Sequence, residues 1–217
     1  MNKRQAWIHA VLIAAAFGSS SAFSQAPAAF PRAYLGLGLG MGDASLPSSG
    51  GQIGGAAVTT STNKSGSTSW KAYAGYRFDP RWGIELGYNN LGNKFEETLA
   101  TAGGSATAHA NVTSAYAAAT GTFDVGNRFA LLGKLGLARH WASIDSVCVG
   151  ATCTAPRGSN LWGLVAGIGA EYSLTSQYGI RVEYEDYGKV TQGDVLNTGN
   201  SGSLRASAWT LSGKAVF

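Results

Sequence analysis

Charged residues are scarce in this chain: Asp, Glu, Lys and Arg make up 13% of its 217 residues, and cysteine occurs only twice. The few Lys and Arg residues form no cluster, which argues against a nucleic-acid-binding surface. Two thiols without a neighbouring His or Cys cannot complete a zinc site, so we expect no metal site and no cofactor. No apolar run after residue 26 is long enough for a transmembrane helix. Nucleic-acid binders, zinc proteins and helical membrane proteins are thereby excluded.

Histidine is also rare, and this limits the catalytic options. His9 lies in the leader described below, which leaves His109 and His140. Ser143 and Asp145 follow His140 closely, and hydrolytic chemistry needs a nucleophile, a base and an orienting acid. No Gly-x-Ser-x-Gly motif is present. We therefore expect no enzyme, and a lipid-modifying activity built on His140 ranks last among the alternatives.

The first residues are typical of a secretory signal peptide. A positively charged start is followed by an apolar stretch too short to cross a membrane, and then by small residues up to Ala26. The sequence predicts a signal peptide over residues 1–26 and one mature domain over 27–217. Cleavage after Ala22 or Ser24 is an alternative, because a proline follows Ala26.

The two cysteines, Cys148 and Cys153, both lie in the exported part of the chain. Thiols that are close in sequence tend to be oxidised in such a compartment. We expect them to form a disulfide within one loop.

Glycine is abundant, with 31 residues, and aromatic residues make up 11%. Several segments alternate apolar and small or polar residues with period two, as in Leu35, Leu37 and Leu39 against the glycines between them. This pattern is typical of membrane β-strands, which alternate between lipid and lumen. Eight candidate strands cover residues 33–42, 70–78, 82–89, 111–123, 129–141, 161–174, 178–187 and 205–217. The strand within 111–123 is too rich in alanine for its faces to be assigned.

Two features favour a membrane barrel over a soluble β-sandwich. Aromatic residues sit at the ends of the apolar faces, as girdles at two membrane interfaces require. The connections also alternate between short turns and long polar segments, the latter at 43–68, 92–110, 142–160 and 187–203. We predict an all-β fold, an eight-stranded antiparallel up-and-down transmembrane β-barrel. Both ends of the barrel sequence are expected on the short-turn side.

Charged residues on the polar strand faces would point into the barrel lumen. They are Lys71, Arg77, Glu85, Lys134, Glu171, Arg181, Glu183, Glu185 and Lys214. Isolated charges are costly in a narrow interior of low dielectric, so these groups should form a connected salt-bridge network. The network either only fills and stiffens the barrel or opens a narrow pore by exchanging partners.

Three segments resemble the OmpA-type transmembrane domain of Gram-negative outer membranes: GYRFDPRWGIELGYNNLG, GKLG and GIGAEYSLTSQYGIRVEYEDYG. The resemblance implies that Glu85 pairs with Lys134 and that Glu171 and Arg181 complete a cluster proposed to act as a gate. The peptidoglycan-binding domain of longer members is expected to be missing. The outward terminal aromatic, Phe217, resembles the signal that the outer-membrane assembly machinery reads.

We therefore expect a monomeric outer-membrane protein of a Gram-negative bacterium, with a structural and surface-interaction role exerted through long external loops. A low-conductance channel gated by the lumen charges is the alternative. The expected partners are outer-membrane lipid and lipopolysaccharide, the assembly machinery through the C-terminal strand, and a host or cell-surface partner at the loops. No nucleic-acid partner is expected.

Overall fold

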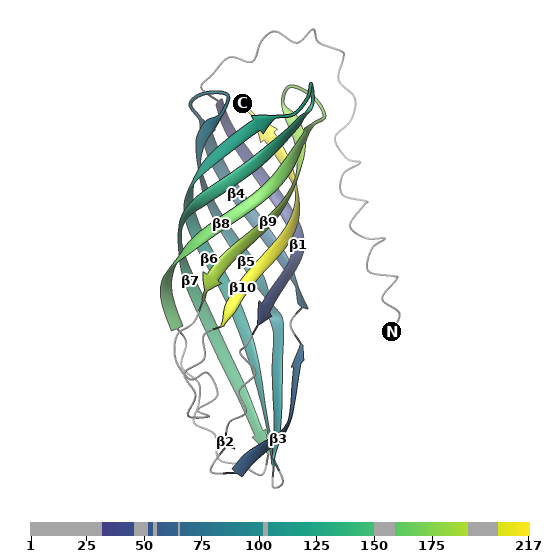
Figure 1. Cartoon of the computed structure of the whole chain (residues 1–217), viewed down its shortest axis with the longest axis vertical. Coiled ribbons are helices and arrows are strands. Elements are labelled where there is room, and N and C mark those ends of the chain that lie inside the picture. Colours follow the sequence, from purple (N-terminus) through teal and green to yellow (C-terminus); the bar gives the residue numbers. More distant parts are fainter. Residues whose placement is uncertain are drawn as a thin grey trace.

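Period-two alternation gives most of the predicted strands one apolar and one polar face, and a closed sheet is the arrangement that satisfies all backbone groups in a membrane. The computed structural model describes residues 32–45, 52–53, 56–64, 66–101, 104–149, 159–190 and 204–217. Within them, ten strands form one antiparallel sheet (Figure 1). Their bounds are β1 Arg32–Ser45, β2 Gln52–Ile53, β3 Ala56–Lys64, β4 Gly66–Arg77, β5 Trp82–Thr101, β6 Gly104–Asp124, β7 Phe129–Val149, β8 Ser159–Ser173, β9 Tyr178–Lys189 and β10 Arg205–Val216.

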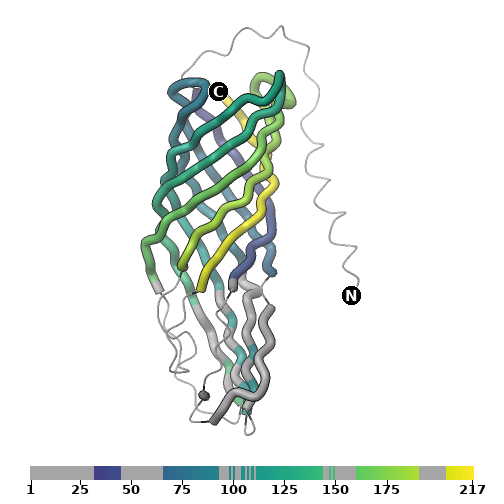
Figure 2. Tube along the Cα trace, in the orientation of Figure 1, coloured from purple at the N-terminus to yellow at the C-terminus, as the bar shows by residue number. Residues whose placement is uncertain are grey.

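The barrel closes where the first strand meets the last. β1 pairs with β4 on one side and with β10 on the other, so Leu35 lies opposite both Ala74 and Ala215. The remaining neighbours are consecutive in sequence, from β4 through β10. The strands tilt around the barrel axis (Figure 2). The predicted eight-stranded up-and-down barrel is confirmed, formed within the described residues by β1 and β4–β10.

Side chains alternate between a lipid-facing surface and the lumen. Leu37, Leu135 and Trp162 are among the exposed apolar residues of the outer surface. The strand whose faces could not be assigned, now part of β6, points Tyr116 inward and Phe123 outward. Its register with β5 places Tyr116 opposite Gly87. Exposed aromatic residues occupy both ends of the outer face, as membrane-interface girdles do. They are Tyr76, Phe78, Trp82, Phe123, Phe129, Tyr172, Tyr178 and Phe217 toward the short turns, and Trp70, Tyr88, Trp162 and Trp209 toward the other end.

The expectation of long loops was wrong over much of its range. Residues 56–64, 92–101, 104–110 and 142–149 lie in strands. β3 continues the line of β4, and both pair with β5 in one register, since Lys64 lies opposite Glu96 and Trp70 opposite Asn90. These segments project beyond the other strands (Figure 1). The hydrogen-bonded ladders of the barrel therefore continue past its rim.

Some expectations concern residues that lie outside the described part. The predicted signal peptide, residues 1–26, is one of them, and so is Cys153. The Cys148 backbone lies in β7 opposite Ala106, and its pairing with Cys153 stays a prediction. Within the described residues, no helix is long and apolar enough to cross a membrane.

Candidate functional site: the barrel lumen and the sheet beyond it

Glu85 is at the centre of the lumen charges. Its carboxylate is fully buried on β5 and accepts a hydrogen bond of 2.6 Å from Arg181 at Oε2 and one of 2.9 Å from Lys134 at Oε1. The hydroxyls of Tyr34 and Tyr116 donate to the same two oxygens, at 3.0 Å and 2.7 Å. A buried carboxylate needs this many partners, because each unpaired oxygen would keep its desolvation cost. The charged side chain within an apolar strand is thus fully solvated by protein groups.

Two inward glycines create the space for these tyrosines. Tyr34 lies opposite Gly75 in the β1–β4 ladder, and a Cβ at Gly75 would fall 2.1 Å from the Tyr34 ring. Tyr116 lies opposite Gly87, where a Cβ would fall 2.3 Å from its ring. Since no side chain fits there, each ring lies flat across the neighbouring strand and directs its hydroxyl at Glu85. The glycines therefore belong to the Glu85 site although they touch no charge.

Glu171 on β8 gathers the cations nearest the short turns. Oε1 accepts from Arg181 Nε at 2.7 Å, and Oε2 accepts from Arg77 at 2.8 Å and from Lys214. Arg181 on β9 thus joins Glu171 to Glu85. Arg77 is the most exposed of these side chains, at 19%. The network meets water at this end.

Two further carboxylates extend the network from β9. Lys71 Nζ lies 2.7 Å from Glu183 and 3.0 Å from Glu185, and Lys134 Nζ lies 2.8 Å and 2.6 Å from the same two side chains. Two lysines and two carboxylates therefore alternate in one cluster, which reaches Glu85 through Lys134. Each charge has at least two opposite neighbours, which offsets the cost of burying it.

The lumen therefore holds five cations and four carboxylates in one connected network. The nine residues that the sequence predicted to point inward all do so: Lys71, Arg77, Glu85, Lys134, Glu171, Arg181, Glu183, Glu185 and Lys214. The tyrosines that hold Glu85 were not singled out. Aromatic residues at inward positions opposite a glycine are the signal that could have indicated them.

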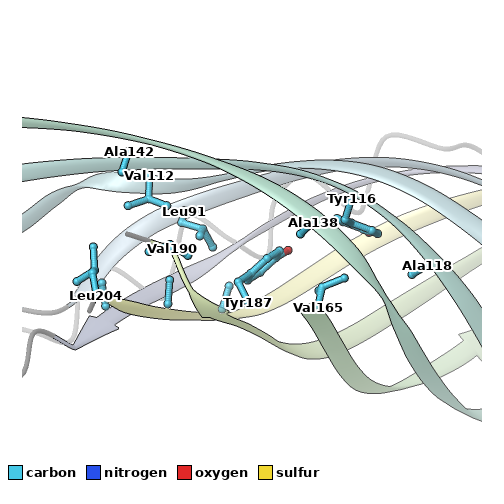
Figure 3. Close-up of a cluster of buried hydrophobic side chains, with 13 residues drawn as sticks. Leu91, Val112, Tyr116, Ala118, Ala138, Ala142, Val165, Tyr187, Val190 and Leu204 are labelled. Carbon is cyan, nitrogen blue, oxygen red and sulfur yellow. The ribbon is translucent and has the colours of Figure 1, made fainter. Parts of the chain in front are cut away.

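An apolar layer, unexpected from the sequence, fills the lumen toward the extended end. Figure 3 shows its members converging from several strands. Besides Tyr116, its largest members are Leu91, Val112, Val165, Tyr187, Val190 and Leu204, all buried at 0% exposure. Leu91 continues the inward alternation of Glu85, Gly87 and Asn89 on β5. A β-bulge begins at this point: the register with β6 shifts between Asn90 and Gly92, and Gly92 has a φ of 107° that favours glycine. The bulge brings the Leu91 carbonyl so close to Gly42 that a Cβ there would lie 2.2 Å from it.

His140 lies buried at the edge of this apolar layer. Its Nδ1 is 2.7 Å from Ser114 Oγ, and its ring packs edge-on against Tyr187 with centroids 6.1 Å apart. Ser143 is exposed on the opposite face of β7, so strand alternation separates it from His140. The Asp145 backbone lies opposite His109, and its side chain is outside the described part. The Ser143–His140 combination considered for catalysis is therefore not assembled.

Beyond the barrel rim, β3, β5, β6 and β7 form a four-stranded sheet. β5 and β6 stay paired up to Thr101 and Gly104, and β6 and β7 up to Ser105 and Val149. The ladder between β7 and β8 ends earlier, at Ala142 and Ser159. Residues 143–149 consequently have a paired neighbour on the β6 side alone, as far as the described strands reach. Val147 and Val149 are 61% and 65% exposed in this segment.

Phe217 follows β10 at the short-turn end. Its ring is 72% exposed, and its backbone amide donates to the Ala33 carbonyl at 2.9 Å. The terminal aromatic is thus tied to the closing strand pair and faces outward, as expected. Its role as an assembly signal stays a prediction.

The family of this chain follows from its similarity to known proteins. A search of curated proteins finds no match. Among solved structures, the fold is similar to OprG of Pseudomonas aeruginosa, with a TM-score of 0.59, 16% identity and coverage of 86% of this chain and 96% of that one. It is also similar to Ail, the attachment invasion locus protein of Yersinia pestis, with a TM-score of 0.50, 12% identity and coverage of 86% and 99%. The family model described as "Outer membrane protein beta-barrel domain" matches residues 10–217. The chain therefore belongs to that family, as an OmpA-like barrel of the Gram-negative outer membrane.

Proposed function

We propose that this protein is a surface-interaction protein whose sealed barrel anchors a sheet outside the cell. The observation that carries the proposal is the continuation of β3, β5, β6 and β7 beyond the aromatic girdle. A barrel that served only to span the membrane would need short connections at both ends. Four ordered strands past the rim form a surface that can contact another molecule.

The edge of this sheet is suited to an extended peptide of a partner protein. Strand addition to an open edge supplies main-chain hydrogen bonds, and exposed side chains supply specificity. Among the described strands, the β7 segment 143–149 has such an edge, and Val147 and Val149 add apolar contact area. The partner we propose is therefore a protein on another cell surface or in its matrix. Ail is named for attachment and invasion, but it shares only the fold with this chain, so the proposal depends on the sheet.

The test is adherence of bacteria that display the protein to immobilised fibronectin and laminin and to cultured epithelial cells. Deleting residues 93–111 and inserting Asn-Gly joins Gly92 to its register partner Val112 through a two-residue hairpin. We expect wild-type cells to adhere at least about tenfold more than the deletion variant, which is the change that about 1.4 kcal/mol of binding energy produces. Heat-modifiable gel mobility serves as the folding control.

A finer variant keeps the sheet and changes only its edge. Val147→Thr with Val149→Thr retains β-branched side chains and removes apolar surface. Adherence should fall with both residues changed, whereas Val182→Thr on the lipid face should leave it unaltered. Equal adherence of wild-type and hairpin-deleted cells to every probe would contradict the proposed function.

The channel alternative faces two seals in series. The charged side chains between Lys71 and Arg181 are almost fully buried, and the apolar layer around Leu91 and Tyr187 lies beyond them. An ion would have to disrupt both. In planar bilayers we expect no discrete openings from wild type or from Lys134→Ala, because this change leaves the apolar layer intact. Openings in wild type that Lys134→Ala alters would instead establish the gated channel.

A further inference from the structure

A hollow of about 370 Å³ interrupts the lipid-facing surface near the short turns. It lies across β5, β6 and β7, and the residues that shape it are Arg81, Trp82, Gly121, Phe123, Leu131 and Gly133. The hollow is shallow and open toward the lipid. No part of the lumen network or of the extended sheet contributes to it.

Two glycines that face each other form the floor of this hollow. Gly121 on β6 pairs with Gly133 on β7, at outward positions where the neighbouring rungs carry Phe123 with Leu131 and Ala119 with Leu135. A Cβ at Gly133 would meet nothing within 4 Å. The floor is therefore open, while apolar side chains rise around it.

The walls of the hollow are apolar. The Trp82 ring lies against Gly121, where a Cβ would fall 3.3 Å from it. Trp82, Phe123 and Leu131 are each about half exposed or more. Inside a bilayer this lining would contact hydrocarbon, and a concave apolar surface is filled better by one ordered acyl chain than by tumbling ones. Trp82 also belongs to the aromatic girdle, so the mouth of the hollow lies at the headgroup level.

The backbone of Arg81 is hydrogen-bonded at that mouth. Its backbone amide donates to Asp79 Oδ1 at 2.7 Å, and its carbonyl accepts from the Thr122 amide at 2.7 Å. Its side chain is exposed, and no carboxylate lies within 4 Å of it in the described parts of the chain. Guanidinium groups bind phosphate oxygens in a bidentate manner. A phosphate at the headgroup level next to Trp82 would neutralise the charge of the Arg81 guanidinium.

We propose that this hollow is a phospholipid site in the leaflet on the short-turn side. One acyl chain lies over Gly121 and Gly133, and Arg81 binds the headgroup phosphate. The occupant is a membrane phospholipid, because hydrocarbon lining and a cation at the interface together match both ends of such a molecule. The site is independent of the surface function proposed above.

Photoactivatable lipids in vesicles test this assignment. Phosphatidylglycerol and diacylglycerol carrying the same diazirine acyl chain are compared, and adducts are located by mass spectrometry. In wild type we expect phosphatidylglycerol to label residues 121–133 several-fold more than diacylglycerol does. Arg81→Gln should remove the difference between the two probes. Arg128→Gln, a change to an exposed arginine in the neighbouring turn, should leave the difference in place.

Filling the hollow supplies a second, independent variant. Gly133→Leu should reduce labelling of 121–133 to the level of the surrounding barrel surface. Its matched control is Gly213→Leu, because Gly213 is also an outward glycine with open space around it. Three results would overturn the assignment: equal labelling by the two probes in wild type, labelling that Gly133→Leu leaves unchanged, or cross-linking between two protein copies through this segment in place of lipid adducts.

Discussion

The two halves of the lumen are closed by opposite chemistries. Toward the short turns, nine charged side chains hold one another in a fixed arrangement around Glu85 and Glu171. Toward the extended end, Leu91, Val112 and their neighbours fill the same width with hydrocarbon. Charged packing is specific but fragile, since each member depends on its partners. In apolar packing, the loss of stability grows with the side-chain volume that is removed. A barrel can therefore be closed by charged or by apolar side chains, and substitutions in each half should differ in their effect.

The largest effect is expected from removing the cation that joins the two central carboxylates. Arg181→Met leaves Glu85 and Glu171 buried without their shared partner, and breaking a buried pair in this way costs about 3–5 kcal/mol. The free energy of unfolding, measured by denaturant titration in lipid vesicles, should fall by that amount. Arg205→Met is the matched control, because Arg205 is exposed and 3.8 Å from Asp186. Its effect should stay below about 1 kcal/mol. If both variants lost the same free energy of unfolding, the buried charge network would not be special for stability.

The apolar layer should respond through lost volume. Leu91→Ala leaves a cavity at a fully buried position, and such a change usually lowers the free energy of unfolding by about 2–5 kcal/mol. We expect a loss somewhat smaller than that of Arg181→Met. Leu91→Met keeps the volume and should cost less than about 1.5 kcal/mol. The same titration measures both. If Leu91→Met destabilised the barrel as strongly as Leu91→Ala, simple space filling would not describe this layer.

The smallest effect is expected where a glycine holds space for a tyrosine of the charged half. Gly87→Ala places a methyl group 2.3 Å from the Tyr116 ring, and overpacking of this kind costs about 1–3 kcal/mol. Gly213→Ala adds the same methyl group where nothing lies within 4 Å, and it should leave stability nearly unchanged. Thermal unfolding followed by gel mobility compares the pair. A stable Gly87→Ala protein would show that Tyr116 can move without cost.

Much of the barrel could be predicted from the sequence because one physical rule governs it. A period of two sends alternate side chains to lipid and lumen, so the outward leucines and the inward charges follow from counting. The alanine-rich β6 resisted this rule because alanine suits both faces. Its ladders with β5 and β7, which place Tyr116 opposite Gly87 and Ala138, fix the orientation.

The apolar layer and the extended sheet could not be predicted for two physical reasons. Leu91 keeps the inward alternation of β5, but it lies past the strand end expected at Asn89 and next to Gly92, which reads as the start of a loop. Leu204 borders a segment expected as loop. The sheet beyond the rim is rich in Gly, Ser, Thr and Ala, a composition that reads as loop when taken alone. Its pairing comes from neighbouring strands, such as the contact between the Thr98 and Thr107 hydroxyls at 3.2 Å.

The pairing of β1 with β10 also bears on how the protein folds. Leu35 lies opposite Ala215, so the contact that completes the ring joins positions from the two extremes of the barrel sequence. Contacts of such long sequence separation form slowly, because the chain loses loop entropy before these contacts can stabilise it. Until they form, β1 and β10 each present an unpaired edge. Ring closure is therefore the step at which the growing sheet stops being prone to aggregation, and the time spent before it is the period in which a chaperone would matter most.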